Sequence, residues 1–142
     1  MAKKIIAYNT NSVIGAPILA ASAASLVQGT VVSIGTDGKI VPGDCRASGG
    51  PLPARGFLLQ DAQQKDPKGN VLDTLLQGSF TFEGKVGGLS GLTTGATYYL
   101  LSGGAIQSTK PAGSTGDIDQ SVGYALDDKT LVIKIGEPIF HA

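Results

Sequence analysis

The sequence is poor in the residues that carry out chemistry. It has no tryptophan, one cysteine and one histidine among its 142 residues. The single cysteine, Cys45, excludes an intrachain disulfide and a cysteine-based zinc site, and we expect a partly buried free thiol. The single histidine, His141, stands next to the last residue, where we expect it to be exposed. Without a second histidine, the sequence offers no credible Ser/His/Asp or Cys/His catalytic set.

Charge is scarce as well. Charged residues make up 15% of the chain, against the roughly 25% that is usual in soluble domains. Eleven basic and eleven acidic side chains cancel, so no long-range field draws the chain to nucleic acid or anionic lipid. No apolar run is long enough to cross a membrane. We therefore expect no nucleic acid and no membrane as partners. A surface with so few charges is typical either of a protein that a partner partly covers or of a monomer that tends to associate non-specifically.

Glycine and turn residues are abundant instead. Glycine accounts for 21 residues, about double its average share, without a collagen-like period. Short apolar or alternating runs follow one another about every ten residues, separated by Gly, Asp and Pro turns. This pattern predicts an all-β fold with almost no helix: a small β-barrel or sandwich of short antiparallel strands. The length fits one such domain.

The clearest predicted hairpins lie in the second half of the chain. ATYYLL and AIQST flank a Ser-Gly-Gly turn, and SVGYAL and TLVIKI flank an Asp-Asp-Lys turn. In the last strand, Leu131, Ile133 and Ile135 alternate inward. Tyr98 and Tyr99 are neighbours on one strand, so one should face the core and the other should face outward or contact a neighbouring subunit.

Pairs of carboxylates occur, but in predicted turns. The pairs are Asp117 with Asp119 and Asp127 with Asp128. Aspartate is favoured in turns because its side chain accepts hydrogen bonds from the local backbone, and a glycosidase would need the pair to face across a cleft. The GDID stretch lacks the full EF-hand loop, and GKVGGLSG lacks the Gly-Lys-Ser/Thr ending of a phosphate loop. We expect no enzyme activity, no metal and no cofactor. Carbohydrate binding would favour tryptophan, although four tyrosines leave it open.

The first 25 residues differ from the rest. They contain many apolar side chains but sustain neither a period of 2 nor one of 3.6. Burying each such side chain is worth roughly 1.5 to 3 kcal/mol, whereas ordering the backbone costs about 1 to 2 kcal/mol per residue. We therefore predict an extended N-terminal arm over residues 1–25 that is mobile in the free protein and ordered on a partner, followed by a β-domain over residues 26–142 with a short C-terminal tail.

Four segments in a characteristic order carry a resemblance to a known family. They are SLVQGTVVSIGTDGKIVP, ARGFLLQDA, GLTTGATYYLLSGGAI and SVGYALDDKTLVIKI, within residues 25 to 136. This order resembles the small β-barrel head proteins of tailed bacteriophages known as decoration, cement or auxiliary capsid proteins.

The resemblance implies a virion structural protein, made in the bacterial host cytoplasm and commonly trimeric. It would sit on the outer capsid surface and bridge major capsid proteins, with its N-terminal segment extended along that surface. A head- or tail-fibre base, or a module that binds a glycan or receptor, is the alternative. The candidate capsid or subunit contacts are Lys3, Lys4, Ile5, Ile6, Tyr8, Val13, Ile14, Tyr98 and Tyr99.

Overall fold

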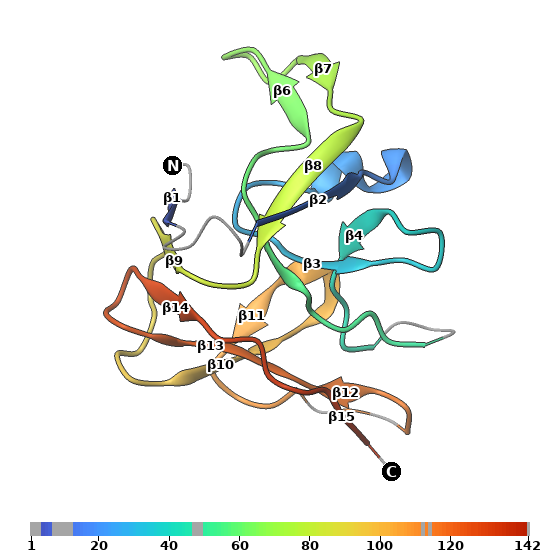
Figure 1. Cartoon of the computed structure of the whole chain (residues 1–142). Coiled ribbons are helices and arrows are strands. Elements are labelled where there is room, and N and C mark those ends of the chain that lie inside the picture. The colour runs from blue at the N-terminus through green and yellow to red at the C-terminus, as the bar shows by residue number, and fades with distance from the viewer. Residues whose placement is uncertain (1–3, 7–12, 47–49, 112, 114, 142) are drawn as a thin grey trace.

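The computed structural model describes residues 4–6, 13–46, 50–111, 113 and 115–141, and within them nearly all regular structure is β (Figure 1). The larger sheet has six strands in the order β1-β9-β14-β13-β10-β11. Its strands are β1 (Lys4–Ile6), β9 (Lys85–Gly87), β14 (Leu131–Ile133), β13 (Ser121–Ala125), β10 (Thr97–Leu100) and β11 (Ile106–Gln107).

The second sheet has five strands in the order β2-β8-β5-β3-β4. Its strands are β2 (Val13–Pro17), β8 (Gln77–Thr81), β5 (Gly56–Leu58), β3 (Val31–Ile34) and β4 (Ile40–Pro42). Two small two-stranded ribbons complete the fold, β6 (Gln63–Lys65) with β7 (Val71–Thr74) and β12 (Ile118–Asp119) with β15 (Ile139–Phe140). All strand pairs within the sheets are antiparallel.

The five-stranded sheet has a core on each of its faces. Val31 and Phe57 belong to the cluster shared with the six-stranded sheet, whereas their chain neighbours Val32 and Leu58 belong to a second cluster. That second cluster is covered by the chain around the 3-10 helix η2 (Ala20–Ser25). Because adjacent residues of a strand point to opposite faces, a strand buried on both faces shows a continuous apolar run instead of alternation. GFL of β5 is such a run, and VVSI of β3 is one apart from the buried Ser33.

The predicted all-β class is confirmed, in its sandwich form. The two large sheets stay open, with β1 and β11 at the edges of one and β2 and β4 at the edges of the other. Helical structure in the described ranges is limited to 3-10 turns, η2 and η3 (Ser102–Gly104).

Both predicted C-terminal hairpins are confirmed. β10 pairs with β11 across η3, and β13 pairs with β14. Gly104 adopts a φ of 77°, and a side chain there would collide with Thr30, so glycine is required both by the turn and by close packing. Leu131 and Ile133 face the core as predicted.

The segment expected as a short C-terminal tail contains a strand. β15 pairs with β12 and so brings His141 beside Asp119. In β8, Phe80 and its neighbour Thr81 are both buried, because the sheet is covered on both faces.

The described part of the predicted arm runs along the sandwich. β1 pairs with β9, and β2 pairs with β8 over its full length. Ile18 follows β2 and is buried in the second core cluster. A strand at a sheet edge is held by backbone hydrogen bonds, which impose no side-chain period, and this is why the pattern did not reveal the pairing. Release of this segment in the free protein stays a prediction.

Candidate interaction surface

Side chains capable of chemistry are dispersed. In the part of the chain that the structure describes, no group of three or more His, Cys, Asp or Glu residues could hold a metal ion. Cys45 is fully buried, and burial, reinforced by the nearby negative charge of Asp44, raises the pKa of its thiol. A raised pKa keeps the sulfur protonated and therefore poorly nucleophilic. No helix among the described residues is long and apolar enough to cross a membrane.

His141 is only half-exposed, contrary to the sequence-based expectation. Its Nε2 lies 3.0 Å from Oδ1 of Asp119, and the backbone N–H of His141 donates to the carbonyl of Asp117 at 2.8 Å. The contact joins the two strands of the β12–β15 ribbon. The side chain of His141 therefore fastens the end of the ribbon.

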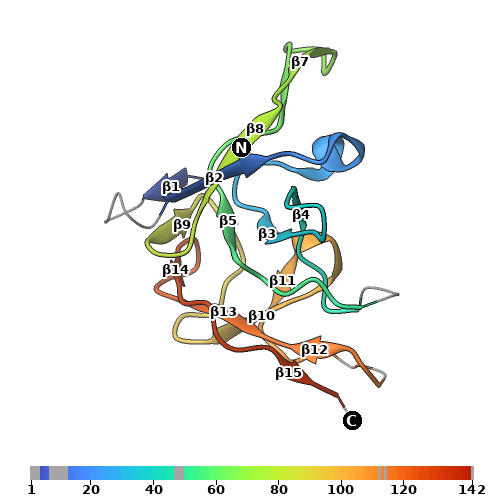
Figure 2. The same ribbon diagram turned by 45° about the vertical axis from the view of Figure 1, so that its right-hand side comes forward.

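The β6–β7 ribbon projects from the sandwich as a hairpin, which Figures 1 and 2 show rising clear of the body. Its turn is built on Asp66, whose Oδ1 accepts the backbone N–H groups of Lys68 at 2.9 Å and Asn70 at 2.8 Å. At its base, the N–H of Leu75 donates to the carbonyl of Ala62 at 2.8 Å, and Ala62 is fully buried. The hairpin is thus anchored at its base and closed by local turn chemistry.

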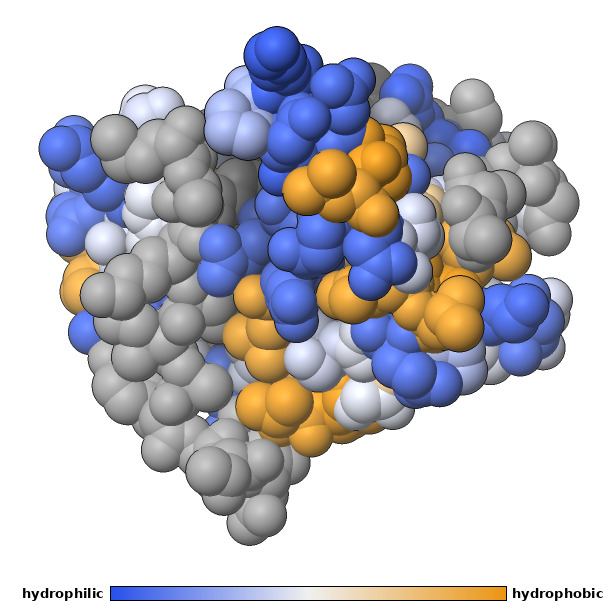
Figure 3. Space-filling view, turned by 90° about the horizontal axis from the view of Figure 1, so that it is seen from above, coloured by the Kyte–Doolittle hydropathy of each residue, from blue (hydrophilic) through white to orange (hydrophobic). Residues whose placement is uncertain are grey.

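The projecting hairpin carries apolar side chains that the chain itself leaves uncovered. Val71, Leu72 and Leu76 are 50%, 70% and 80% exposed. We call these three residues the hairpin patch. A two-stranded hairpin standing alone is marginally stable in water, so a partner that covered these side chains would also steady the hairpin. Figure 3 looks down on this end of the molecule and shows hydrophobic groups set among hydrophilic ones.

A second apolar area lies on the edge of the five-stranded sheet. Val13 and Ile14 of β2 are 38% and 43% exposed, and Phe82, just beyond β8, is 36% exposed. We call these three residues the edge patch. Val13 pairs with Thr81, the residue before Phe82. Within the described structure β2 pairs with β8 alone, and only the following residue, Ile18, bridges to Ile40 of β4. The other side of β2 therefore presents backbone groups that can accept a further strand.

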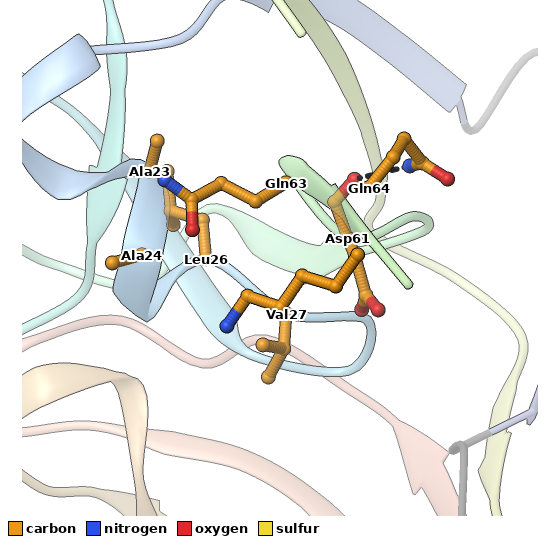
Figure 4. Close-up of a pocket in the computed structure, with 8 residues that line it drawn as sticks. Ala23, Ala24, Leu26, Val27, Asp61, Gln63 and Gln64 are labelled. Carbon is orange, nitrogen blue, oxygen red and sulfur yellow. Dashed lines mark hydrogen bonds between the residues drawn. The ribbon is translucent and has the colours of Figure 1, made fainter. Parts of the chain in front are cut away.

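A small hollow of about 210 Å³ lies at the base of the hairpin (Figure 4). One wall comes from η2 and the residues after it, and the other comes from the chain around β6. The lining residues are Ala23, Ala24, Leu26, Val27, Asp61, Gln63, Gln64 and Lys65. Apolar side chains facing two amides, one carboxylate and the ammonium group of Lys65 can seat a side chain of a partner.

Of the predicted contact residues in the arm, Lys3 and Tyr8 lie outside the described residues. Lys4, Ile5 and Ile6 form β1, which pairs with β9 at the edge of the six-stranded sheet. Val13 and Ile14 are exposed as a contact requires.

The two predicted tyrosines separate as expected for neighbours on a strand. Tyr98 is buried in the core, and its hydroxyl oxygen accepts the N–H of Thr93 at 2.9 Å, so it is not a surface contact. Tyr99 is half-buried and belongs to the six-stranded sheet, whereas Val13 and Ile14 belong to the other sheet. The hairpin patch was not predicted, although consecutive apolar residues in VLDTLL were a signal of it.

Comparison with known proteins gives a likeness of fold. No model of a known protein family matches the chain, and no curated protein matches it. A solved structure titled "Mycobacterium phage Patience" matches with a TM-score of 0.67 and 10% sequence identity, over 96% of this chain and 98% of that one. At so low an identity the likeness establishes the fold alone. The chain therefore shares its fold, over nearly its whole length, with a bacteriophage protein.

Proposed function

We propose that the chain is a virion structural protein that binds the outer surface of a phage capsid and stabilises it by bridging major capsid proteins. The observation that carries this proposal is the presence of two exposed apolar patches on a small sandwich, one on a projecting hairpin and one on an open sheet edge. The fold shared with a bacteriophage protein and the resemblance of the sequence to decoration proteins support it.

Adhesion of this kind depends on buried area and valency. Burying one apolar side chain is worth roughly 1.5 to 3 kcal/mol, so a few exposed residues give a modest contact. Several copies that bind together multiply modest contacts into firm attachment through effective concentration. We propose a homotrimer, with Tyr99 as the candidate subunit contact, and attachment without catalysis.

The test measures binding to heads of the phage that encodes the chain, after the native copies have been stripped off. Two paired variants, L72S with L76S and V13S with I14S, remove the apolar side chains of the two patches but keep the backbone. We expect each pair to weaken head binding about tenfold or more, because each change removes roughly 1.5 kcal/mol or more of burial. Thermal unfolding should stay unchanged.

The matched control is I139S with F140S, since these side chains are 64% and 62% exposed and lie at the opposite end of the molecule, on β15 (Figure 1). It should bind heads like the unchanged protein. Co-sedimentation with isolated tails instead of heads would refute the proposal. Equal head binding by the control and both patch variants would refute it as well.

A further inference from the structure

The outer face of the six-stranded sheet contains a hollow created by a β-bulge. Tyr98 pairs with Gly123 and Tyr99 with Ser121, so Val122 is an extra residue in β13. Gly123 also pairs with the buried Ile133, and Val122 and Gly123 are both buried. The bulge therefore turns two consecutive residues inward and leaves a gap on the outer face, and bulges often reshape a sheet beside binding sites.

The gap measures about 240 Å³ and is lined by Thr97, Ser121, Gly123, Tyr124 and Lys134. Position 123 requires glycine, because a side chain there would collide with the backbone carbonyl of Val132. Thr97 and Val132 both pair with Tyr124, one from each neighbouring strand, so the central strands of the sheet hold this residue from both sides. The hollow is thus built on rigid strands.

The lining combines three kinds of group. Tyr124 offers an aromatic ring that is 42% exposed. Thr97 and Ser121 offer hydroxyls, each able to donate and accept a hydrogen bond. Lys134 is exposed and forms no ion pair within the described residues, and no carboxylate lines the hollow. A ring, two hydroxyls and one uncompensated positive charge therefore meet in one place.

We propose that this hollow binds a saccharide unit that carries a carboxylate, such as a hexuronate within an acidic polysaccharide. The C–H groups of a sugar ring carry partial positive charge and pack on the negative face of the Tyr124 ring. Sugar hydroxyls match Thr97 and Ser121, and the carboxylate matches the ammonium group of Lys134. A simple anion would leave the aromatic ring unused, and a neutral sugar would leave the positive charge unused.

Tyr99 allows subunit association and saccharide binding to be tested separately. It pairs with Ser121 and flanks the hollow, but it does not line it. A contact between subunits through Tyr99 and a sugar contact through Tyr124 are therefore separable. The variant Y99A should change the state of association without changing saccharide affinity. Saccharide binding here does not depend on capsid binding, because neither the hairpin patch nor the edge patch lies on the outer face of the six-stranded sheet.

The experiment titrates the full chain with uronic-acid trisaccharides (galacturonate, glucuronate and mannuronate) and with maltotriose as the neutral match of equal length. Amide chemical shifts and calorimetry report where and how tightly each binds. We expect an acidic trisaccharide to bind about tenfold more tightly than maltotriose and to shift the amide signals of Ser121, Tyr124 and Lys134.

Three variants test the assigned roles. Y124A should lose about tenfold in affinity, Y124F should keep it, and K134Q should bring acidic and neutral sugars close to parity. F140A removes an exposed aromatic ring elsewhere and should change nothing. Thermal melts confirm that each variant is folded. The proposal is overturned if none of the acidic trisaccharides shifts these amides at millimolar concentration, if maltotriose binds equally well, or if Y124A binds like the unchanged protein.

Discussion

Two hairpins of this molecule have the same kind of turn and opposite surroundings. In the β13–β14 hairpin, Oδ1 of Asp127 accepts the N–H of Lys129 at 2.8 Å. In the β6–β7 hairpin, Asp66 accepts N–H groups in the same way. Yet Leu131 of β14 is completely buried, whereas Leu72 of β7 is 70% exposed.

The difference lies in what surrounds each pair of strands. β14 lies between β9 and β13, and its inward side chains pack into the core that the two sheets share. β7 has β6 as its one strand neighbour in the described structure. Turn chemistry thus decides that two strands pair, and the neighbouring sheet decides whether their apolar residues are buried. Apolar residues on a hairpin without such a neighbour are available for a contact outside the chain.

The largest expected effect separates the two leucines. L131A should lower the free energy of unfolding by about 2 to 5 kcal/mol, because it leaves a cavity in the shared core. L72A should change it by less than about 0.5 kcal/mol, because solvent already reaches this side chain. Urea denaturation with unchanged slopes would measure both. Comparable losses in the two variants would show that the projecting hairpin packs against the body, contrary to this structure.

The second effect compares a buried amide beside β13 with an exposed one on β6. Gln120 is buried and joins three backbone groups: its Oε1 accepts the N–H of Ala54 at 2.6 Å, and its Nε2 donates to the carbonyls of Ala54 at 3.1 Å and Gly136 at 3.0 Å. Q120A should cost roughly 1 to 3 kcal/mol, since buried polar groups lose their partners.

The matched variant for this comparison is Q64A. Gln64 is exposed, and its Nε2 donates to the carbonyl of Asp61 at 3.3 Å, a position that water can take over. We expect a change within about 0.5 kcal/mol. If thermal and urea unfolding showed equal losses of stability in Q64A and Q120A, the hydrogen bonds of Gln120 would not stabilise the fold.

The same contrast explains which features of the fold could be predicted from the sequence. Leu131 and Ile133 alternate with solvent-facing residues, so their pattern alone predicted strand, face and burial. Gly123 inside an alternating run was a usable signal of a bulge, because glycine within a strand often marks one. The hollow above the bulge, however, depends on which strands flank β13, and this pairing is not local.

Other features depended on pairings between distant segments. The contact of His141 with Asp119 arises from the β12–β15 ribbon. Each strand of this ribbon has two residues, which is too short for a pattern that predicts a strand. The pairing of β2 with β8 is a backbone effect that leaves no side-chain period. None of the described residues covers Leu72, so a sequence pattern that reflects the chain's own core could not predict its exposure.

The smallest expected effect is a loss of stability at low pH. Backbone hydrogen bonds lower the pKa of both turn aspartates, chiefly from Asn70 to Asp66 and from Lys129 to Asp127. A carboxyl group with a lowered pKa in the folded state contributes stability above its unfolded pKa and loses it as the pH falls through the folded value. Both turns should therefore weaken below about pH 4, and neither carboxylate is buried, so the effect should be slight.

The two hairpins should lose this contribution in different ways. Weakening at Asp127 opens strands that belong to the core, so it should appear as a small fall in the thermal midpoint, and D127N should reduce that acid dependence. Weakening at Asp66 should appear as faster hydrogen exchange of the Lys68 and Asn70 amides, corrected for intrinsic rates, at an unchanged midpoint. D66N should produce this local loss already at neutral pH. An equal shift of the midpoint by D66N and D127N would mean that the projecting hairpin unfolds together with the core, and the contrast between the two hairpins would not hold.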